Sequence, residues 1–292
     1  MSAPVSTSGP RDEELALPSG PRLALRRLDG TRRPFLLVHG LASNARLWDG
    51  VGLRLAAAGH EAVAVDLRGH GRSEVTPTGY DTATAAADLA LLLPLLGWLG
   101  PRAPIVVGQS WGGNVVLHLA ARHGGVAGMA LVDGGWIRLA DRFASFSECW
   151  QVLAPPEFEG VPHSELTARL TAWTQDWPAE AVAGVMANFV ERGDGTVRAR
   201  LPRESHRAIL RSMWEGDQRA LYPQVAVPSV LLAATDTPDP AAKRTAVAEA
   251  MAGLPDAQVH WYPDAHHDLH AQQPARTTAD LLALAARVDD GR

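Results

Sequence analysis

Short apolar runs alternate with longer amphipathic segments along most of this chain. Several runs are continuously apolar, which is typical of parallel strands covered on both faces. They predict strands at residues 14–18, 23–28, 35–39, 62–66, 105–107, 129–132, 230–233 and 259–262. The segments between them predict helices at residues 45–58, 82–98, 111–123, 241–251 and 275–288. This alternation indicates an α/β fold with a mostly parallel eight-stranded sheet flanked by helices.

Local signals mark where some of these elements begin and end. Asp81 is suited to cap the helix at 82–98, because its carboxylate can accept hydrogen bonds from the exposed N–H groups of the first turn. Gly59 and Gly124 stand where two helices should stop. A short turn at residues 18–21 joins the first two strands, so we expect an antiparallel hairpin at one edge of the sheet.

The alternation stops between residues 135 and 223. Helical patterns occur there at 164–173, 180–191 and 204–214, without a convincing strand pair. Five of the nine tryptophans lie in this segment: Trp136, Trp150, Trp173, Trp177 and Trp214. We therefore predict a disordered tail at 1–13, a core at 14–134 and 224–292, and an all-helical lid inserted at 135–223. Trp136, Trp173 and Trp214 are the candidates for contact with substrate.

Composition narrows the classes of protein that this chain can be. A formal net charge of -5 argues against a nucleic-acid partner, because phosphate-binding surfaces need clustered Lys and Arg. The single cysteine, Cys149, excludes an internal disulfide and any cysteine-based metal cluster. The apolar segment 89–99 is too short to span a membrane, and the first 20 residues lack a signal-peptide pattern. We expect a cytoplasmic protein that acts on a small molecule, and its oligomeric state stays open.

The strongest local motif is Gly108-Gln109-Ser110-Trp111-Gly112-Gly113, between a predicted strand and a predicted helix. A nucleophilic serine needs an exposed hydroxyl at a sharp turn, and small neighbours leave room for that turn. The N–H groups at the start of the following helix favour a developing oxyanion. Ser110 is therefore the candidate nucleophile, whereas the plain structural alternative is a glycine-rich turn.

A serine hydroxyl needs a nearby base, and three histidines follow the last predicted strand. His266, His267 and His270 lie within five residues of one another. They could hold a metal ion, but no carboxylate pattern typical of a hydrolytic metal centre accompanies them. They could also be ordinary residues of a surface loop. On the residues alone, all three interpretations stay open.

Taken together, these motifs resemble the α/β-hydrolase superfamily, and the resemblance covers nearly all of residues 14–288. Two further segments carry it: Leu36-Leu37-Val38-His39-Gly40, and Asp66 to Ser73 with the sequence DLRGHGRS. The resemblance implies that His267, by its spacing to Pro274, is the base. It also implies an oxyanion hole formed by the backbone N–H groups of Leu41 and Trp111, a structural role for the 66–73 loop, and no cofactor.

The acid that orients His267 is less sharply defined. The family usually places it after the penultimate strand, where Ala233-Ala234-Thr235-Asp236 resembles the expected pattern with Ala in place of Gly. Asp239 is a nearby rival. Some relatives carry the acid one strand earlier, and Asp133 occupies that place. The requirement is a carboxylate within reach of the second imidazole nitrogen, so all three stay candidates, with Asp236 preferred.

The resemblance implies hydrolysis of an ester or lactone of a small, apolar substrate through an acyl-enzyme. Ser110 sets the chain apart from relatives that use an aspartate or cysteine nucleophile. Other serine-dependent branches stay open: proline iminopeptidases, C–C bond hydrolases and cofactor-free haloperoxidases. A ligand receptor with slow turnover is the alternative from another class, since fold alone does not fix function.

Overall fold

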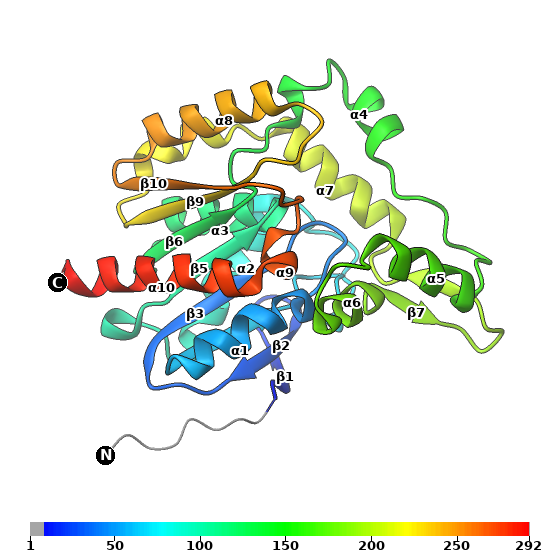
Figure 1. Cartoon of the computed structure of the whole chain (residues 1–292), viewed down its shortest axis with the longest axis horizontal. Helices are drawn as coiled ribbons and strands as arrows, with labels where there is room; N and C mark the ends of the chain where they lie inside the picture. The colour runs from blue at the N-terminus through cyan, green and yellow to red at the C-terminus, as the bar shows by residue number, and fades with distance from the viewer. Residues whose placement is uncertain (1–8, 292) are drawn as a thin grey trace.

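The computed structural model describes residues 9–291, and an eight-stranded sheet lies at its centre (Figure 1). In spatial order the strands are β1 (Arg11–Ala16), β2 (Arg22–Leu28), β4 (His60–Val65), β3 (Arg32–Val38), β5 (Ile105–Gln109), β6 (Gly128–Val132), β9 (Ser229–Ala234) and β10 (Ala257–Tyr262). β2 runs antiparallel to β1 and β4, and the other pairs are parallel. The predicted mostly parallel sheet and its edge hairpin are both confirmed.

The central strands are apolar on both faces, as the continuous runs predicted. Along β3, Phe35 and Leu37 pack on one face while Leu36 and Val38 pack on the other, and all four are buried. Successive side chains of a strand point to opposite faces, so each face needs its own covering layer. The sheet therefore lies between two helical layers.

One layer is formed by α1 (Asp49–Ala57), which follows a 3-10 turn at Ala45–Trp48, and by α10 (Pro274–Asp290). The opposite layer contains α2 (Thr82–Leu95), α3 (Trp111–Arg122) and α8 (Pro240–Gly253). Asp81 caps α2 as predicted, since its carboxylate accepts a hydrogen bond from Thr84 N–H at 2.8 Å. Gly59 and Gly124 both adopt positive φ where helices end.

The segment between β6 and β9, which we call the insertion, leaves the sheet at the carboxyl ends of its strands (Figure 1). Its helices are α4 (Phe146–Leu153), α5 (His163–Trp173), α6 (Ala179–Met186) and α7 (Arg203–Glu215). Short 3-10 turns lie at Leu139–Asp141, Gln218–Ala220 and Tyr222–Gln224. No helix within residues 9–291 is long and apolar enough to cross a bilayer.

Two predictions about secondary structure were wrong. The insertion is not all helical, because β7 (Phe189–Glu191) and β8 (Val197–Ala199) form an antiparallel hairpin. Residues 192–195 make its turn, closed by a hydrogen bond from Gly195 N–H to the Arg192 carbonyl oxygen at 3.0 Å, and Gly195 has φ 79°. The helix predicted to reach Glu191 ends at Met186 instead. The predicted tail is also too long, because β1 begins at Arg11 and pairs with β2. Residues 1–8 lie outside the described part of the chain.

Candidate active site

Ser110 is the single residue that connects β5, which ends at Gln109, to α3, which begins at Trp111, and the chain turns sharply there. Its backbone has φ 53° and ψ -122°, a conformation that costs a non-glycine residue of order 1–3 kcal/mol. Gly108 permits this turn, because a Cβ there would lie 2.1 Å from the carbonyl oxygen of Gly112. Strain of this kind is characteristic of a nucleophile held above the edge of a sheet.

The loop after β3 lies directly beside this turn. β3 and β5 are neighbours, with Val38 opposite Gly108, so Gly40 packs against Ser110. A Cβ on Gly40 would come within 2.9 Å of the Ser110 Cβ, so glycine is required for the close approach. Within residues 9–291, the backbone N–H groups of Leu41 and Trp111 have no acceptor. Two unused donors therefore lie on either side of the serine turn.

Two buried histidines hold the loop after β3 in place. His39 Nδ1 lies 2.7 Å from the Gly40 carbonyl oxygen, and its Nε2 accepts a hydrogen bond from Leu67 N–H at 3.0 Å. His70 Nε2 accepts a hydrogen bond from Ala42 N–H at 3.3 Å. Burial lowers the pKa of both imidazoles, so both are neutral and can accept these bonds. The backbone beside Ser110 is thus fixed by uncharged side chains.

His267 pairs with Asp133. Its Nδ1 lies 2.7 Å from Asp133 Oδ2, and the carboxylate is 2% exposed. Asp133 follows β6, the strand next to β5, and adopts φ 44° at that strand end. On the other side, the side-chain amide of Gln109 donates a hydrogen bond to the His267 carbonyl oxygen at 3.2 Å. The serine and the histidine loop are therefore linked through the residue that precedes Ser110.

The charges of this pair are coupled. Desolvation lowers the pKa of His267, but the hydrogen bond and negative charge of Asp133 outweigh it and raise the pKa above its ordinary value. Desolvation raises the pKa of Asp133, but His267 and Lys243 outweigh it and lower that pKa overall. Asp133 is therefore a carboxylate at neutral pH, positioned to stabilise a protonated imidazole.

The preferred candidate for the acid, Asp236, does not make this contact. Its carboxylate is exposed and lies 2.7 Å from Nδ1 of His266 instead. His266 and His267 are neighbours whose side chains point to different partners, and β9 is one strand farther from Ser110 than β6 is. The third candidate, Asp239, accepts a hydrogen bond from Ala242 N–H at 2.9 Å and caps α8. The structure therefore brings Asp133, and neither Asp236 nor Asp239, into contact with His267.

The three histidines that could have formed a metal site serve separate contacts. His270 is fully buried, with its ring 4.2 Å from the ring of Trp48, and desolvation lowers its pKa to about 3. His266 and His267 each pair with a different aspartate. Among residues 9–291, no group of three His, Cys, Asp or Glu side chains is arranged to hold a metal ion.

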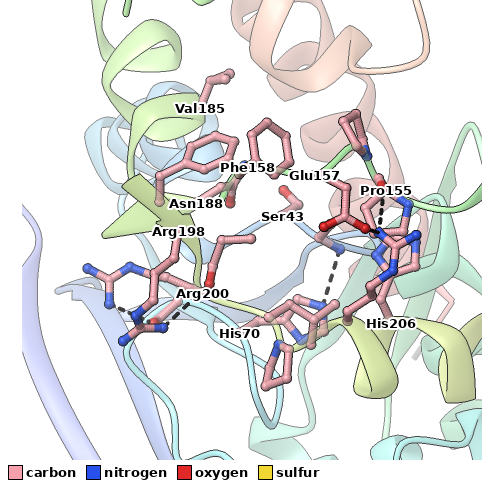
Figure 2. A pocket seen from close by; sticks show the side chains of 18 of the residues that line it. Ser43, His70, Pro155, Glu157, Phe158, Val185, Asn188, Arg198, Arg200 and His206 are labelled. Atoms are coloured by element: carbon pink, nitrogen blue, oxygen red, sulfur yellow. Dashed lines mark hydrogen bonds and ion pairs between the residues drawn. The ribbon is translucent and has the colours of Figure 1, made fainter. Parts of the chain in front are cut away.

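A cavity of about 570 Å³ lies between the insertion and the loops that follow β3 and β4. Figure 2 shows Ser43 and His70 of the core facing Phe158 and Val185 of the insertion. Ser110 is not among the lining residues, but Ala42, which follows Leu41 in the loop after β3, lines the cavity. Its walls are largely apolar.

The three tryptophans predicted to contact substrate are placed differently. Trp173 lines the cavity and is 55% exposed. Trp136 is buried in the core, and Trp214 packs on Phe146 while its indole N–H donates to the Phe143 carbonyl oxygen at 3.0 Å. Neither lines the cavity, because both sit where the insertion joins the core and supply its apolar packing.

Sequence reasoning did not single out two side chains that the structure brings to the site, Gln109 and Lys243. Gln109 lies inside the serine motif, and its position before Ser110 was the available signal. Lys243 Nζ lies 2.9 Å from both carboxylate oxygens of Asp133, although the two residues are 110 positions apart in the chain. No local pattern in the sequence reveals that contact.

Several known proteins are similar to this chain over part of its sequence. A putative non-heme haloperoxidase of Mycobacterium phage D29 is 34% identical over 39% of this chain and 39% of its own length. An esterase of Mycobacterium tuberculosis is 37% identical over 43% of this chain and 41% of its own length. The chain therefore matches about two fifths of each relative's length.

Solved structures agree over far more of the chain. E-2-(acetamidomethylene)succinate hydrolase has a TM-score of 0.79 at 23% identity, over 94% of this chain and 98% of the other. The structure of the M. tuberculosis esterase has a TM-score of 0.74 at 22% identity, over 95% and 92%. The model of the alpha/beta hydrolase family matches residues 35–281. The chain belongs to the α/β-hydrolase family.

Proposed function

We propose that this protein is a serine hydrolase that cleaves carboxylic esters or lactones through an acyl-enzyme. One observation carries the proposal: a serine at a strained strand–helix turn shares its sheet edge with a His267–Asp133 pair whose nitrogen and oxygen lie 2.7 Å apart. In the first reaction step Ser110 attacks the ester carbonyl carbon while His267 takes the hydroxyl proton. The ester C–O bond then breaks, and His267 gives that proton to the departing alcohol, which leaves the acyl group on Ser110. Water activated by His267 then releases the acid.

The tetrahedral intermediate carries a negative charge on the former carbonyl oxygen. The N–H groups of Leu41 and Trp111, which have no acceptor within residues 9–291, are the donors proposed to bind it. Donors fixed before the reaction need no reorganisation, and in an oxyanion hole each is worth about 3–4 kcal/mol. Asp133 is the proposed acid, because its carboxylate keeps the imidazole in the tautomer that leaves Nε2 free as base.

We propose the insertion as a lid whose cavity receives the acyl group. Support comes from its apolar walls, with Phe158, Leu170, Trp173, Val185 and Phe189 contributed by the insertion. An esterase and haloperoxidases occur among the sequence relatives, and both names fit the proposed site, because water and hydrogen peroxide can attack the same acyl-enzyme carbonyl. Hydrolysis of a small apolar ester is the activity we favour.

A fluorophosphonate probe tests the nucleophile without knowledge of the natural substrate. We expect one adduct per chain, on Ser110, because only an activated serine reacts rapidly with such a probe. Peptide mapping by mass spectrometry locates the adduct. Ser110→Ala should remove it, while Ser43→Ala, in the cavity wall, should leave it unchanged. Absence of labelling in the wild-type protein, or labelling elsewhere, would overturn the proposal.

Replacement of Trp173 with Ala tests the lid. Loss of a large apolar surface from the cavity wall should weaken binding of long acyl chains by about 1–3 kcal/mol, roughly 10-fold in kcat/KM or more, while acetate ester turnover changes little. A panel of p-nitrophenyl esters from acetate to decanoate measures the effect. Val152→Ala, an exposed change on α4, is the control. Equal loss across all chain lengths would mean that Trp173 serves packing alone.

A further inference from the structure

Lys243 occupies an unusual position beside the His267–Asp133 pair. It lies near the start of α8, and its ammonium group reaches back over the end of β9 to Asp133. Nζ lies 2.9 Å from Oδ1 and 2.9 Å from Oδ2 of Asp133, and 3.1 Å from the carbonyl oxygen of Ala234. An ammonium group has three N–H donors, so these three acceptors use all of them.

Both oxygens of the Asp133 carboxylate also accept hydrogen bonds. Oδ1 accepts hydrogen bonds from Ala234 N–H at 3.0 Å and from Lys243, and Oδ2 accepts from His267 and Lys243. Its side chain is 2% exposed and that of Lys243 is 14% exposed, so the contact is largely withdrawn from water. Breaking a buried pair of this kind leaves an uncompensated charge, which is far costlier than loss of a surface ion pair.

The location of Lys243 also carries an electrostatic cost. A cation near the N-terminus of a helix is disfavoured by the helix dipole, and withdrawal of a long, charged side chain from water costs further free energy. The residue before it in the helix, Ala242, and the one after it, Arg244, are both exposed. Of these three consecutive residues, only Lys243 points toward the Asp133 carboxylate. Its ion pair with Asp133 offsets those two costs.

We infer that Lys243 is a positioning residue for the reaction proposed above: it fixes the plane of the Asp133 carboxylate toward His267 and limits how basic that histidine becomes. The inference rests on the proposed function, since it concerns His267 and Asp133, two of the side chains to which that function gives a role. Lys243 acts through Asp133 and touches no reacting atom. Its two effects can be separated, because one depends on geometry and the other on charge.

The effect on basicity follows from the charges that face His267. Asp133 and Asp268 favour the protonated imidazole and raise its pKa, while Lys243 opposes them and lowers it. His266, on the same loop, pairs with Asp236, and His270 is neutral because desolvation lowers its pKa to about 3. Removal of the lysine charge should therefore raise the pKa of His267 further, and more of the base would be protonated at neutral pH.

Lys243→Met tests the charge, and Arg244→Met is the matched control, since it removes one cation from the next position of α8 without touching Asp133. NMR titration of His267, assigned with His267→Ala, should show a higher pKa in Lys243→Met than in the wild-type protein. The same shift should appear in the acid limb of the rate of fluorophosphonate labelling. Arg244→Met should leave both unchanged.

Lys243→Arg tests the geometry. It keeps the charge, but a planar guanidinium cannot fill a site of three acceptors shaped for an ammonium group. We expect the acid limb to stay near the wild-type position while the plateau rate falls several-fold. Should Lys243→Met fail to fold, Lys243→Gln also removes the charge and should raise the His267 pKa in the same direction.

An unchanged His267 pKa in Lys243→Met or Lys243→Gln would overturn the inference, as would an equal shift in Arg244→Met. The proposed function fails in a different way, by absence of labelling at Ser110 in the wild-type protein. The NMR titration still decides the role of Lys243 in that case, because it needs no substrate and no turnover.

Discussion

Replacement of His267 with Ala is expected to lower kcat for p-nitrophenyl ester hydrolysis by about 10⁶-fold, the loss found when the histidine of a serine protease is removed. Ser110 would have no base within reach, and a neutral hydroxyl is a poor nucleophile at pH 7. Steady-state kinetics measure the loss, and circular dichroism checks that the fold is retained. The half-exposed side chain of His267 makes a purely structural effect small.

His266→Ala is the matched control, because it removes an imidazole from the adjacent position. That change breaks an exposed pair with Asp236, so activity should stay within a few-fold of wild type. Comparable losses in the two variants would contradict the assignment of His267 as the base. Near-normal turnover in His267→Ala would contradict the acyl-enzyme mechanism altogether.

Replacement of Asp133 with Asn is expected to lower kcat by about 10⁴-fold, as the same change does in a serine protease triad. An amide can offer its N–H₂ group to His267 Nδ1, which would favour the tautomer with the proton on Nε2. The base would then carry its proton on the nitrogen that faces Ser110. Rates measured between pH 6 and 9 with a short acetate ester test this.

Asp236→Asn provides the comparison for the acid. Its carboxylate is exposed and pairs with His266, so we expect a change of less than about 1 kcal/mol in the free energy of unfolding and little change in kcat. The opposite result, in which Asp236→Asn is the damaging change, would restore the acid expected from the usual family position. Similar, small effects of both variants would exclude either residue as the triad acid.

The order of strands and helices was predictable because it depends on local patterns. Apolar runs, several of them continuous, marked all eight strands of the central sheet, and Gly59, Asp81 and Gly124 marked helix ends that the structure confirms. The position of Ser110 was visible for the same reason: a serine between small residues, after a buried strand and before a helix, is a short motif with a backbone cause.

The insertion was harder to predict. A three-residue strand is too short to give a periodic pattern, and the hairpin of β7 and β8 was absorbed into a predicted helix. The tryptophans showed that the segment is rich in large apolar side chains, but not which of them face a cavity. Trp136 and Trp173 have the same chemistry, yet one is 6% exposed and the other 55%.

By itself, the sequence determined the fold class, the turn that carries Ser110, and the loop that carries His267. Only the tertiary structure decided which aspartate meets that histidine, and that Lys243 joins them. Asp133 and Asp236 follow neighbouring strands, so each sits at the same edge of the sheet and each satisfies the sequence pattern. The choice depends on the direction in which two adjacent histidines project: His266 meets Asp236, and His267 meets Asp133. The second contact joins residues 134 positions apart, so tertiary packing sets it and no local pattern reveals it.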